Sequence, residues 1–140
     1  GGAYGCGSGI RRDGVIYAYS YRDPGVISTL RAIWGAGDFL RGFSADEREL
    51  SKYIIGTISD MDYPLSNRKR LDDAIRNRIL GISRQELQRE RDEVLSAGLE
   101  DVRDAGRVFD LLKEGAVCTT GSEAEIRKHR GIFDVVDTLL

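Results

Sequence analysis

The sequence predicts an α+β fold in which helices cover one face of a mainly antiparallel sheet. Two observations lead to this prediction. The first 22 residues alternate in side-chain size around a turn, which is typical of a β-hairpin. Most later segments instead repeat their apolar residues at steps of three and four, which is typical of amphipathic helices. The predicted order of strand, strand, helices, strand and helix is that of an α+β layer.

The predicted first strand, residues 1–10, is nearly bare on one face. Successive side chains of a strand point to opposite faces, so Tyr4 is expected opposite a row of glycines. The glycines of this row are Gly1, Gly5, Gly7 and Gly9. Because glycine costs backbone entropy in a strand, such a row normally marks a place where another backbone, a packed helix or a ligand approaches closely.

The predicted second strand, residues 15–22, is aromatic on one face. Its aromatic side chains are Tyr17, Tyr19 and Tyr21. The link at residues 11–14, Arg-Arg-Asp-Gly, has the chemistry of a hairpin turn. We interpret the tyrosines as cross-strand packing, because stacking on nucleic-acid bases would be expected to come with a basic stripe that the chain lacks.

Three helices are predicted after the hairpin. Asp23 as N-cap and Pro24 at the first helical position begin a helix that should reach about Arg41. Gly35 and Gly37 would allow close contact on its buried face. A second helix, residues 47–62, follows a capping box at residues 44–47, and a third is expected over residues 67–80. The residues expected inward on the third helix are Leu71, Ala74, Ile75 and Ile79.

The rest of the chain predicts more helix and one further strand. Ser83 to Glu86 is a capping box, and the apolar pattern after it runs almost to Gly115, as one long helix or two that meet near Gly98. Residues 116–120 predict a short buried strand that includes Cys118. A third capping box, residues 122–125, opens the last helix.

The start of the chain indicates a fragment. The sequence opens without Met, inside what already reads as a strand. Three strands also make a thin sheet for so many helices, so we expect the sheet to be truncated at its N-terminus. The exposed edge that results could pair with another copy of the chain. Within these limits, residues 1–140 are expected to form a single domain.

The composition excludes several partners. With 21 basic and 23 acidic residues the net charge is -2, which does not favour nucleic acid or an anionic membrane. No apolar run approaches the roughly 20 residues that span a bilayer. Cys6 and Cys118 are too few for a disulfide framework and are not spaced as a metal clip. A reducing compartment fits best: a bacterial cytoplasm, or the mitochondrial matrix if the source is eukaryotic.

Three motifs in order carry a resemblance to a known family. They are Gly-Gly-Ala-Tyr-Gly at residues 1–5, Tyr-Ser-Tyr-Arg-Asp-Pro at residues 19–24, and residues 55–62 with Pro-Leu-Ser at 64–66. Together they resemble the C-terminal domain of the insulinase-type (M16) zinc metallopeptidases, in the presequence protease branch. The resemblance covers nearly the whole chain. It implies four related α+β domains in two halves that close over an unfolded peptide, with an inverted His-x-x-Glu-His zinc motif in the N-terminal half.

The resemblance also implies roles for individual residues. Tyr4 stands where the family has a tyrosine that grips the substrate beside the metal, together with an arginine that would lie before Gly1. A phenol suits this task because it is neutral, stiff and donates one hydrogen bond to the carbonyl oxygen where charge builds up. Gly2 and Gly5 would let the peptide backbone approach. Zinc would be bound by another domain, because the only histidine is His129 and a zinc site needs three protein ligands.

Other interpretations of these residues stay open. Pattern alone describes Tyr4 as a half-buried strand tyrosine, and Arg22 either contacts substrate or a neighbouring domain or is structural. The glycine-rich stretch could be a phosphate-binding loop only if a helix followed directly, whereas a second strand follows. For the whole chain, the alternatives to a peptidase domain are a non-catalytic scaffold or peptide-binding subunit of the same fold, and a nucleic-acid-binding domain, which the charge balance disfavours.

Overall fold

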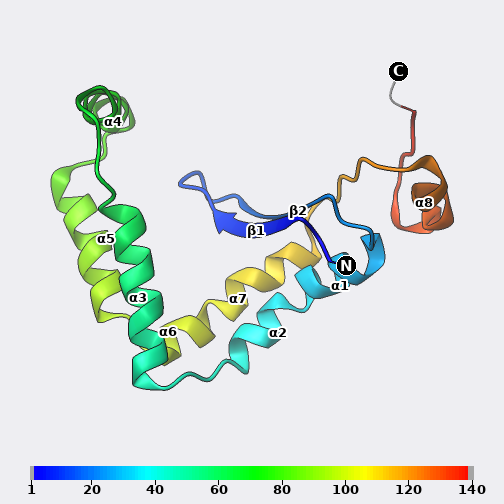
Figure 1. Ribbon diagram of the computed structural model, residues 1–140, viewed down its shortest axis with the longest axis horizontal. Helices are drawn as coiled ribbons and strands as arrows, with labels where there is room; N and C mark the ends of the chain where they lie inside the picture. The colour runs from blue at the N-terminus through cyan, green and yellow to red at the C-terminus, as the bar shows by residue number, and fades with distance from the viewer. Residues whose placement is uncertain (1, 139–140) are drawn as a thin grey trace. The chain divides into compact units, whose positions relative to one another are not determined.

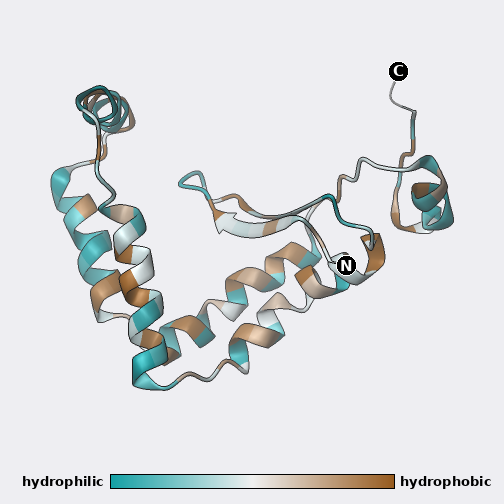
Figure 2. Ribbon diagram, viewed as in Figure 1, coloured by the Kyte–Doolittle hydropathy of each residue, from teal (hydrophilic) through white to brown (hydrophobic). Residues whose placement is uncertain are grey.

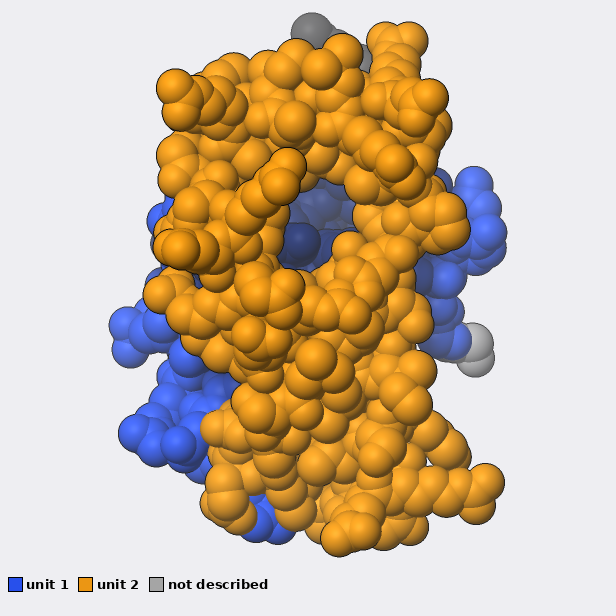
Figure 3. Space-filling model, turned by 90° about the vertical axis from the view of Figure 1, so that its left-hand side faces the viewer, with its two compact units in different colours: residues 1–42, 103–140 blue, residues 43–102 orange. Residues whose placement is uncertain are grey.

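A computed structural model of the chain, which describes residues 2–138, has the predicted α+β fold (Figure 1). Gly1, part of the predicted first strand, lies outside the described residues. The contacts divide the chain into two compact units, coloured separately in Figure 3. Unit 1 comprises residues 1–42 and 103–140, and unit 2 comprises residues 43–102. This division does not test the prediction of a single domain.

Unit 1 contains the predicted hairpin, but residues 2–4, which the prediction placed in the first strand, are not strand. Strand β1 (Gly5–Ile10) pairs antiparallel with β2 (Ile16–Tyr21). The turn between them closes with a hydrogen bond of 2.8 Å from the Arg11 amide to the Val15 carbonyl, and Gly14 takes the left-handed conformation with φ 83°. A hairpin turn of this kind needs a residue that tolerates positive φ, and glycine does so without steric cost.

The register of the hairpin explains two of the glycines on the bare face. Gly7 lies opposite Tyr19 and Gly9 opposite Tyr17, so the tyrosine rings of β2 lie across the glycines of β1. A Cβ atom on Gly7 would come within 2.8 Å of the Tyr19 ring, and one on Gly9 within 2.9 Å of the Tyr17 hydroxyl. The close neighbour at Gly7 and Gly9 is therefore an aromatic ring of the partner strand, rather than the backbone, helix or ligand that such a row was expected to mark.

The prediction of a third strand is wrong for the described chain. Residues 116–120 have no regular secondary structure, and no backbone hydrogen bond among residues 2–138 joins them to β2. An apolar run becomes a strand only where a neighbouring edge supplies partners for its amides and carbonyls. Over the residues that the structure describes, the sheet consists of β1 and β2.

The first predicted helix is interrupted. It begins later than Pro24, as α1 (Val26–Trp34), and continues as α2 (Ala36–Arg41) after a break at Gly35. The later start follows from Asp23, whose carboxylate accepts from the Gly25 amide at 2.9 Å and holds the chain in a turn before α1.

Helix α2 packs closely against α7 (Gly106–Phe109). A Cβ atom on Gly37 would lie 2.7 Å from the Gly106 carbonyl oxygen, and one on Gly106 would lie 2.7 Å from that of Gly37. Gly37 thus allows the close contact that the sequence predicts, although the contact is with a helix. Leu30 of α1 is the buried large hydrophobic residue among those described, and Figure 2 shows the apolar residues of these helices in brown.

Ion pairs connect α2 with the 3₁₀ helix η1 (Asp110–Lys113), which follows α7. The Arg41 guanidinium lies 2.6 Å from the Asp110 carboxylate and also pairs with Asp38. Lys113 lies 2.9 Å from Asp110 and 3.7 Å from Asp38. These four side chains tie the two helices together at their surface.

We expect Asp110→Asn to make folding less sensitive to acid. Hydrogen bonds from Arg41 first, and then from Lys113, lower the pKa of Asp110 from 3.8 to about 2. Because the pKa is lower in the folded chain, ionised Asp110 stabilises the fold fully above about pH 4, and this stabilisation is lost as the pH falls through about 2. The effect is modest because both carboxylate and guanidinium are partly exposed.

Thermal unfolding at about pH 5 and at about pH 2 measures this difference. The Tm of the unaltered chain should fall more between the two values than the Tm of the Asp110→Asn variant. An equal fall in both proteins would contradict a stabilising role of the ionised carboxylate.

Unit 2 consists of α3 (Glu47–Met61), α4 (Asn67–Leu80) and α5 (Arg84–Ser96), and α6 (Leu99–Asp104) runs across its boundary with unit 1. Helices α3 and α5 pack side by side (Figure 1). Arg91 of α5 forms an ion pair with Asp62 at the end of α3. The ion pair thus joins two helices that already lie in contact.

The helix ends of unit 2 follow the local sequence signals closely. Ser83 and Glu86 form the predicted capping box, with hydrogen bonds of 3.1 and 2.7 Å. Ser66 caps α4, and Gly81 ends it with φ 70°. The cap of α3 is Asp46, which accepts from the Glu49 amide at 2.7 Å, rather than the Ser44 box.

Of the two alternatives predicted for the pattern up to Gly115, one long helix or two that meet near Gly98, the structure has the break near Gly98. Helix α5 ends before Ala97, and the Gly98 amide donates to the Asp101 carboxylate at 2.7 Å, as at the start of a new helix. The predicted capping box at residues 122–125 is wrong, since Ser122 makes no side-chain cap hydrogen bond. The last part of the chain holds only α8 (Glu123–Lys128) and the 3₁₀ helix η2 (Arg130–Ile132), as far as residue 138.

The expected inward face of α4 is exposed. Its residues Leu71, Ile75 and Ile79 are all solvent-accessible, although the helix begins and ends as predicted. Periodicity indicates which residues can share a face, but only a neighbouring element can bury that face.

Over residues 2–138, no helix combines the length and apolar character needed to cross a bilayer.

Candidate functional site: the Tyr4 end of the hairpin

The site lies where the chain bends into β1. The Tyr4 amide donates to the Tyr21 carbonyl at 3.0 Å, and Gly5 also lies opposite Tyr21 in the register. Two consecutive residues therefore face one, as in a β-bulge, which changes the direction of a side chain at the end of a strand. The bulge takes Tyr4 out of the alternation of β1.

Tyr4 accordingly lies elsewhere than the alternation predicts. Its ring packs edge-to-face against the ring of Tyr21, with centroids 6.1 Å apart and planes at 82°. Tyr21 belongs to the tyrosine row that lies over the glycines, so the expectation that Tyr4 stands opposite the glycine face is wrong. The ring is 79% exposed, which also excludes the half-buried packing that pattern alone describes.

Arg22 completes the cluster with Tyr4 and Tyr21. Its guanidinium carbon lies 5.7 Å from the Tyr4 ring centroid and 5.5 Å from that of Tyr21, within the range of cation–π interactions. Its φ of 50° makes it the one non-glycine residue with positive φ among residues 2–138. The structure thus brings together Tyr4 and Arg22, which the sequence analysis selected separately. It adds Tyr21, which the sequence analysis assigned to cross-strand packing.

Gly2 and Gly5 differ from the glycines further along the strand. A Cβ atom on either would meet nothing within 4 Å, whereas on Gly7 it would meet the Tyr19 ring. No contact in the described chain therefore requires glycine at these two positions. The space beside Tyr4 is open to the backbone of another molecule or segment.

Asp23 holds the corner that follows Arg22. Its carboxylate accepts from the Ser20 hydroxyl at 2.5 Å, from the Gly25 amide at 2.9 Å and from the Thr29 hydroxyl. These hydrogen bonds, that of Ser20 first, lower the pKa of Asp23. Sequence reasoning assigned Asp23 only a helix cap and missed its link from β2 to α1. The polar residues Ser20 and Thr29 on otherwise packed faces were the available signal.

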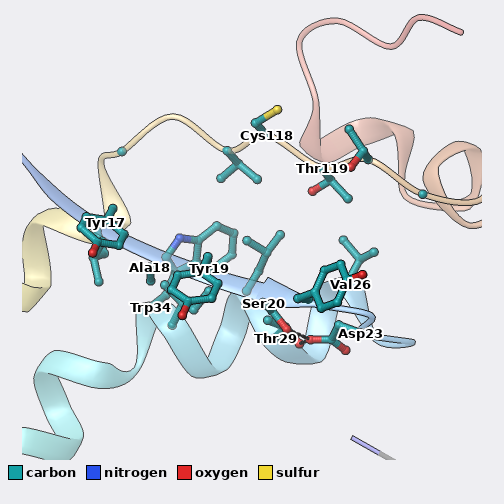
Figure 4. A pocket seen from close by; sticks show the side chains of 18 of the residues that line it. Tyr17, Ala18, Tyr19, Ser20, Asp23, Val26, Thr29, Trp34, Cys118 and Thr119 are labelled. Atoms are coloured by element: carbon teal, nitrogen blue, oxygen red, sulfur yellow. Dashed lines mark hydrogen bonds between the residues drawn. The ribbon is translucent and has the colours of Figure 1, made fainter. Parts of the chain in front are cut away.

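A cavity of about 1280 Å³ lies between β2, α1 and the segment of residues 115–122 (Figure 4). Its lining includes apolar side chains of α1, among them Leu30, Ile33 and Trp34. The carboxylate of Asp23, which also lines it, is already engaged by three donors. Cys118 is exposed rather than buried as predicted. The cavity is thus lined by both apolar and polar side chains, and Arg22 is one of the polar ones.

Comparison with known proteins identifies the family. A family model described as the PreP C-terminal domain matches residues 1–120. The chain belongs to this family. The resemblance to the presequence protease branch, drawn from the three sequence motifs, is thereby confirmed.

Curated relatives of this chain come from bacteria, plants and animals. Protein HypA of Clostridium perfringens is 40% identical over the whole of this chain, and presequence protease 1, chloroplastic/mitochondrial, of Arabidopsis thaliana is 39% identical over 89% of it. The mitochondrial presequence protease of Xenopus laevis is 30% identical over 87% of it. The chain spans only 14%, 12% and 11% of the lengths of these three proteins.

The described residues of this PreP C-terminal domain do not fit a zinc site. Among residues 2–138, no three His, Cys, Asp or Glu side chains lie close enough together to hold a metal ion. His129 lies at the end of α8, and Cys6 and Cys118 are free thiols on separate segments.

Proposed function

We propose that this chain is the substrate-gripping C-terminal domain of a zinc-dependent peptidase that degrades unfolded peptides. The full-length protein that carries it is called the parent below. In this proposal the domain helps to close the degradation chamber and brings Tyr4 to the peptide, while the remaining domains of the parent bind zinc. Family membership supports the proposal, as do the names of two of the three relatives, which are presequence proteases.

The observation that carries the proposal is the presentation of Tyr4. Its backbone is held by the hydrogen bond to Tyr21, its ring packs against the ring of Tyr21, and the side chain is exposed. A neutral phenol in this position can donate a hydrogen bond to a peptide carbonyl oxygen as negative charge builds up there. Gly2 and Gly5 leave room for the peptide backbone beside it.

Arg22 supplies the positive charge of the site. Among residues 2–138 it has no carboxylate within ion-pair distance, and its side chain is exposed. We propose that it lies beside the bound peptide, which is consistent with its position over the Tyr4 ring.

Two of the relatives are named as chloroplastic or mitochondrial proteins. For the parent we propose a reducing compartment.

The proposal predicts that the parent binds zinc and cleaves peptides, whereas the isolated domain does neither. The parent should cleave an unfolded peptide and should stop when a zinc chelator is added, because zinc is held by its other domains. The purified chain of residues 1–140 should contain no stoichiometric zinc and cleave no peptide. Metal analysis and a fluorogenic peptide assay on both proteins measure this.

Two outcomes would contradict the proposal. Tight zinc binding with hydrolysis by the isolated chain would show that the chemistry resides here. A parent that binds unfolded peptides but cleaves none, with or without added zinc, would indicate the non-catalytic scaffold. A mutated parent that lacks its metal ligands is the matched negative control for the assay.

A further inference from the structure

Arg22 occupies a backbone conformation that its side chain disfavours. Its φ of 50° lies in the left-handed region, where the Cβ atom of an ordinary L-residue is crowded. Glycine would adopt this conformation without strain, as Gly14 and Gly81 do elsewhere in the chain. Strained conformations persist where the surrounding structure determines them, often at functional sites. The contacts of the guanidinium should therefore show what the strain achieves.

The left-handed turn takes Arg22 out of the alternation of β2. Had the strand continued, the side chain after Tyr21 would point to the opposite face from the tyrosine row. The turn instead brings the guanidinium within 5.7 Å of the Tyr4 ring centroid and 5.5 Å of the Tyr21 centroid. The planar guanidinium of arginine suits such a position, because it can stack on aromatic faces and stays charged.

The next residue fixes this arrangement. Asp23 is tied to Ser20 of β2 and to Thr29 of α1, so the backbone on the far side of Arg22 is anchored to both elements. On the near side, the Tyr21 carbonyl accepts from the Tyr4 amide at 3.0 Å. Arg22 thus lies between two fixed points, directly over the ring of an exposed residue.

We infer that Arg22 is a positioning residue for Tyr4. Without the guanidinium, the ring contact of Tyr4 that remains is the one with Tyr21, and an exposed aromatic side chain with one such contact samples several rotamers. With it, the Tyr4 ring contacts both a cation and a second ring, which restricts the rotamers of the phenol before the peptide arrives. This inference rests on the proposed role of Tyr4 and adds a second residue to it.

The test is made in the full-length parent with Arg22→Gly. Glycine keeps the left-handed backbone and removes the whole Arg22 side chain, including the guanidinium, so the variant should fold, with a Tm equal to or above that of the parent. Its kcat should fall between about fivefold, the scale of one cation–π contact, and about a hundredfold, the scale of a 1 Å misplacement. KM should change much less, because the guanidinium affects the orientation of the Tyr4 hydroxyl rather than the affinity for the peptide.

Three further variants sharpen the test. Arg22→Asn keeps a residue that tolerates positive φ and should behave like the glycine variant, which guards against a folding defect peculiar to glycine. Arg22→Lys keeps the charge without the planar group and should restore part of the rate. Arg12→Gly, in the turn at the other end of the hairpin, is the matched control and should leave the rate unchanged.

A double-mutant cycle separates this inference from the proposal beneath it. If Arg22 acts through Tyr4, adding Arg22→Gly to Tyr4→Phe should cost little more than Tyr4→Phe alone. Losses that multiply would show that Arg22 acts independently and would overturn the inference. The inference would also be overturned if Arg22→Gly cleaved at the parental rate while Tyr4→Phe was slow. If Tyr4→Phe itself cleaved at the parental rate, the proposed function would be overturned.

Discussion

Replacing Tyr4 by Phe in the parent is expected to lower kcat/KM for peptide cleavage by about 10²–10³-fold, the usual cost of removing one hydrogen-bond donor to a developing oxyanion. The substitution removes a hydroxyl and keeps the ring, so the contacts with Tyr21 and Arg22 remain. Because the side chain is 79% exposed, the free energy of unfolding should stay within about 0.5 kcal/mol of the parental value.

The control for this prediction removes a hydroxyl from the same row of tyrosines. Tyr19→Phe alters a ring that lies over Gly7, away from the bend at Tyr4, and should cleave at the parental rate. Steady-state kinetics with one unfolded peptide compare the three proteins, and circular dichroism verifies that each is folded. If Tyr4→Phe and Tyr19→Phe both cleave at the parental rate, Tyr4 has a structural role only.

Leu30→Ala is expected to destabilise the chain more than any of the other substitutions proposed above. Leu30 is 8% exposed and lies on α1, which contacts η1 beneath the hairpin. Truncating a buried leucine removes apolar contact and leaves a cavity, at a cost of roughly 2–5 kcal/mol. Because most neighbouring apolar side chains of this chain are only partly buried, we expect the lower end, about 2–3 kcal/mol. Denaturant unfolding of the chain measures the difference.

Ile79→Ala provides the matched comparison. Ile79 is of similar size but is 78% exposed on α4, so its truncation should change the free energy of unfolding by no more than about 0.5 kcal/mol. Equal losses for the two variants would contradict the burial difference between α1 and α4. A loss at Ile79 alone would indicate that α4 is packed and α1 is not.

Features that depend on neighbouring residues in sequence could be predicted well. The turn after Ile10, the cap and stop of α4 at Ser66 and Gly81, and the reciprocal hydrogen bonds of Ser83 with Glu86 all follow from side chains within a few positions. Their energetics are local, so the same residues favour the same structure whatever else surrounds them.

The candidate site could be predicted only in part. Tyr4 and Arg22 were selected from separate motifs, but their contact depends on the bulge opposite Tyr21 and on the left-handed turn at Arg22. Neither feature has a sequence signal of its own, since no glycine marks position 22. Strand alternation consequently predicted the wrong face for Tyr4.

By itself, the sequence determined the α+β class, the hairpin, most helix ends and the family motifs, because each depends on local propensity or on residue identity. Only the tertiary structure decided which groups fill the space over Gly7 and Gly9, that residues 116–120 are not a strand, and that Tyr4 lies with Arg22. The physical reason is the same in each case. Burial, strand pairing and ring contacts require a partner distant in sequence, and no local pattern specifies which partner that is.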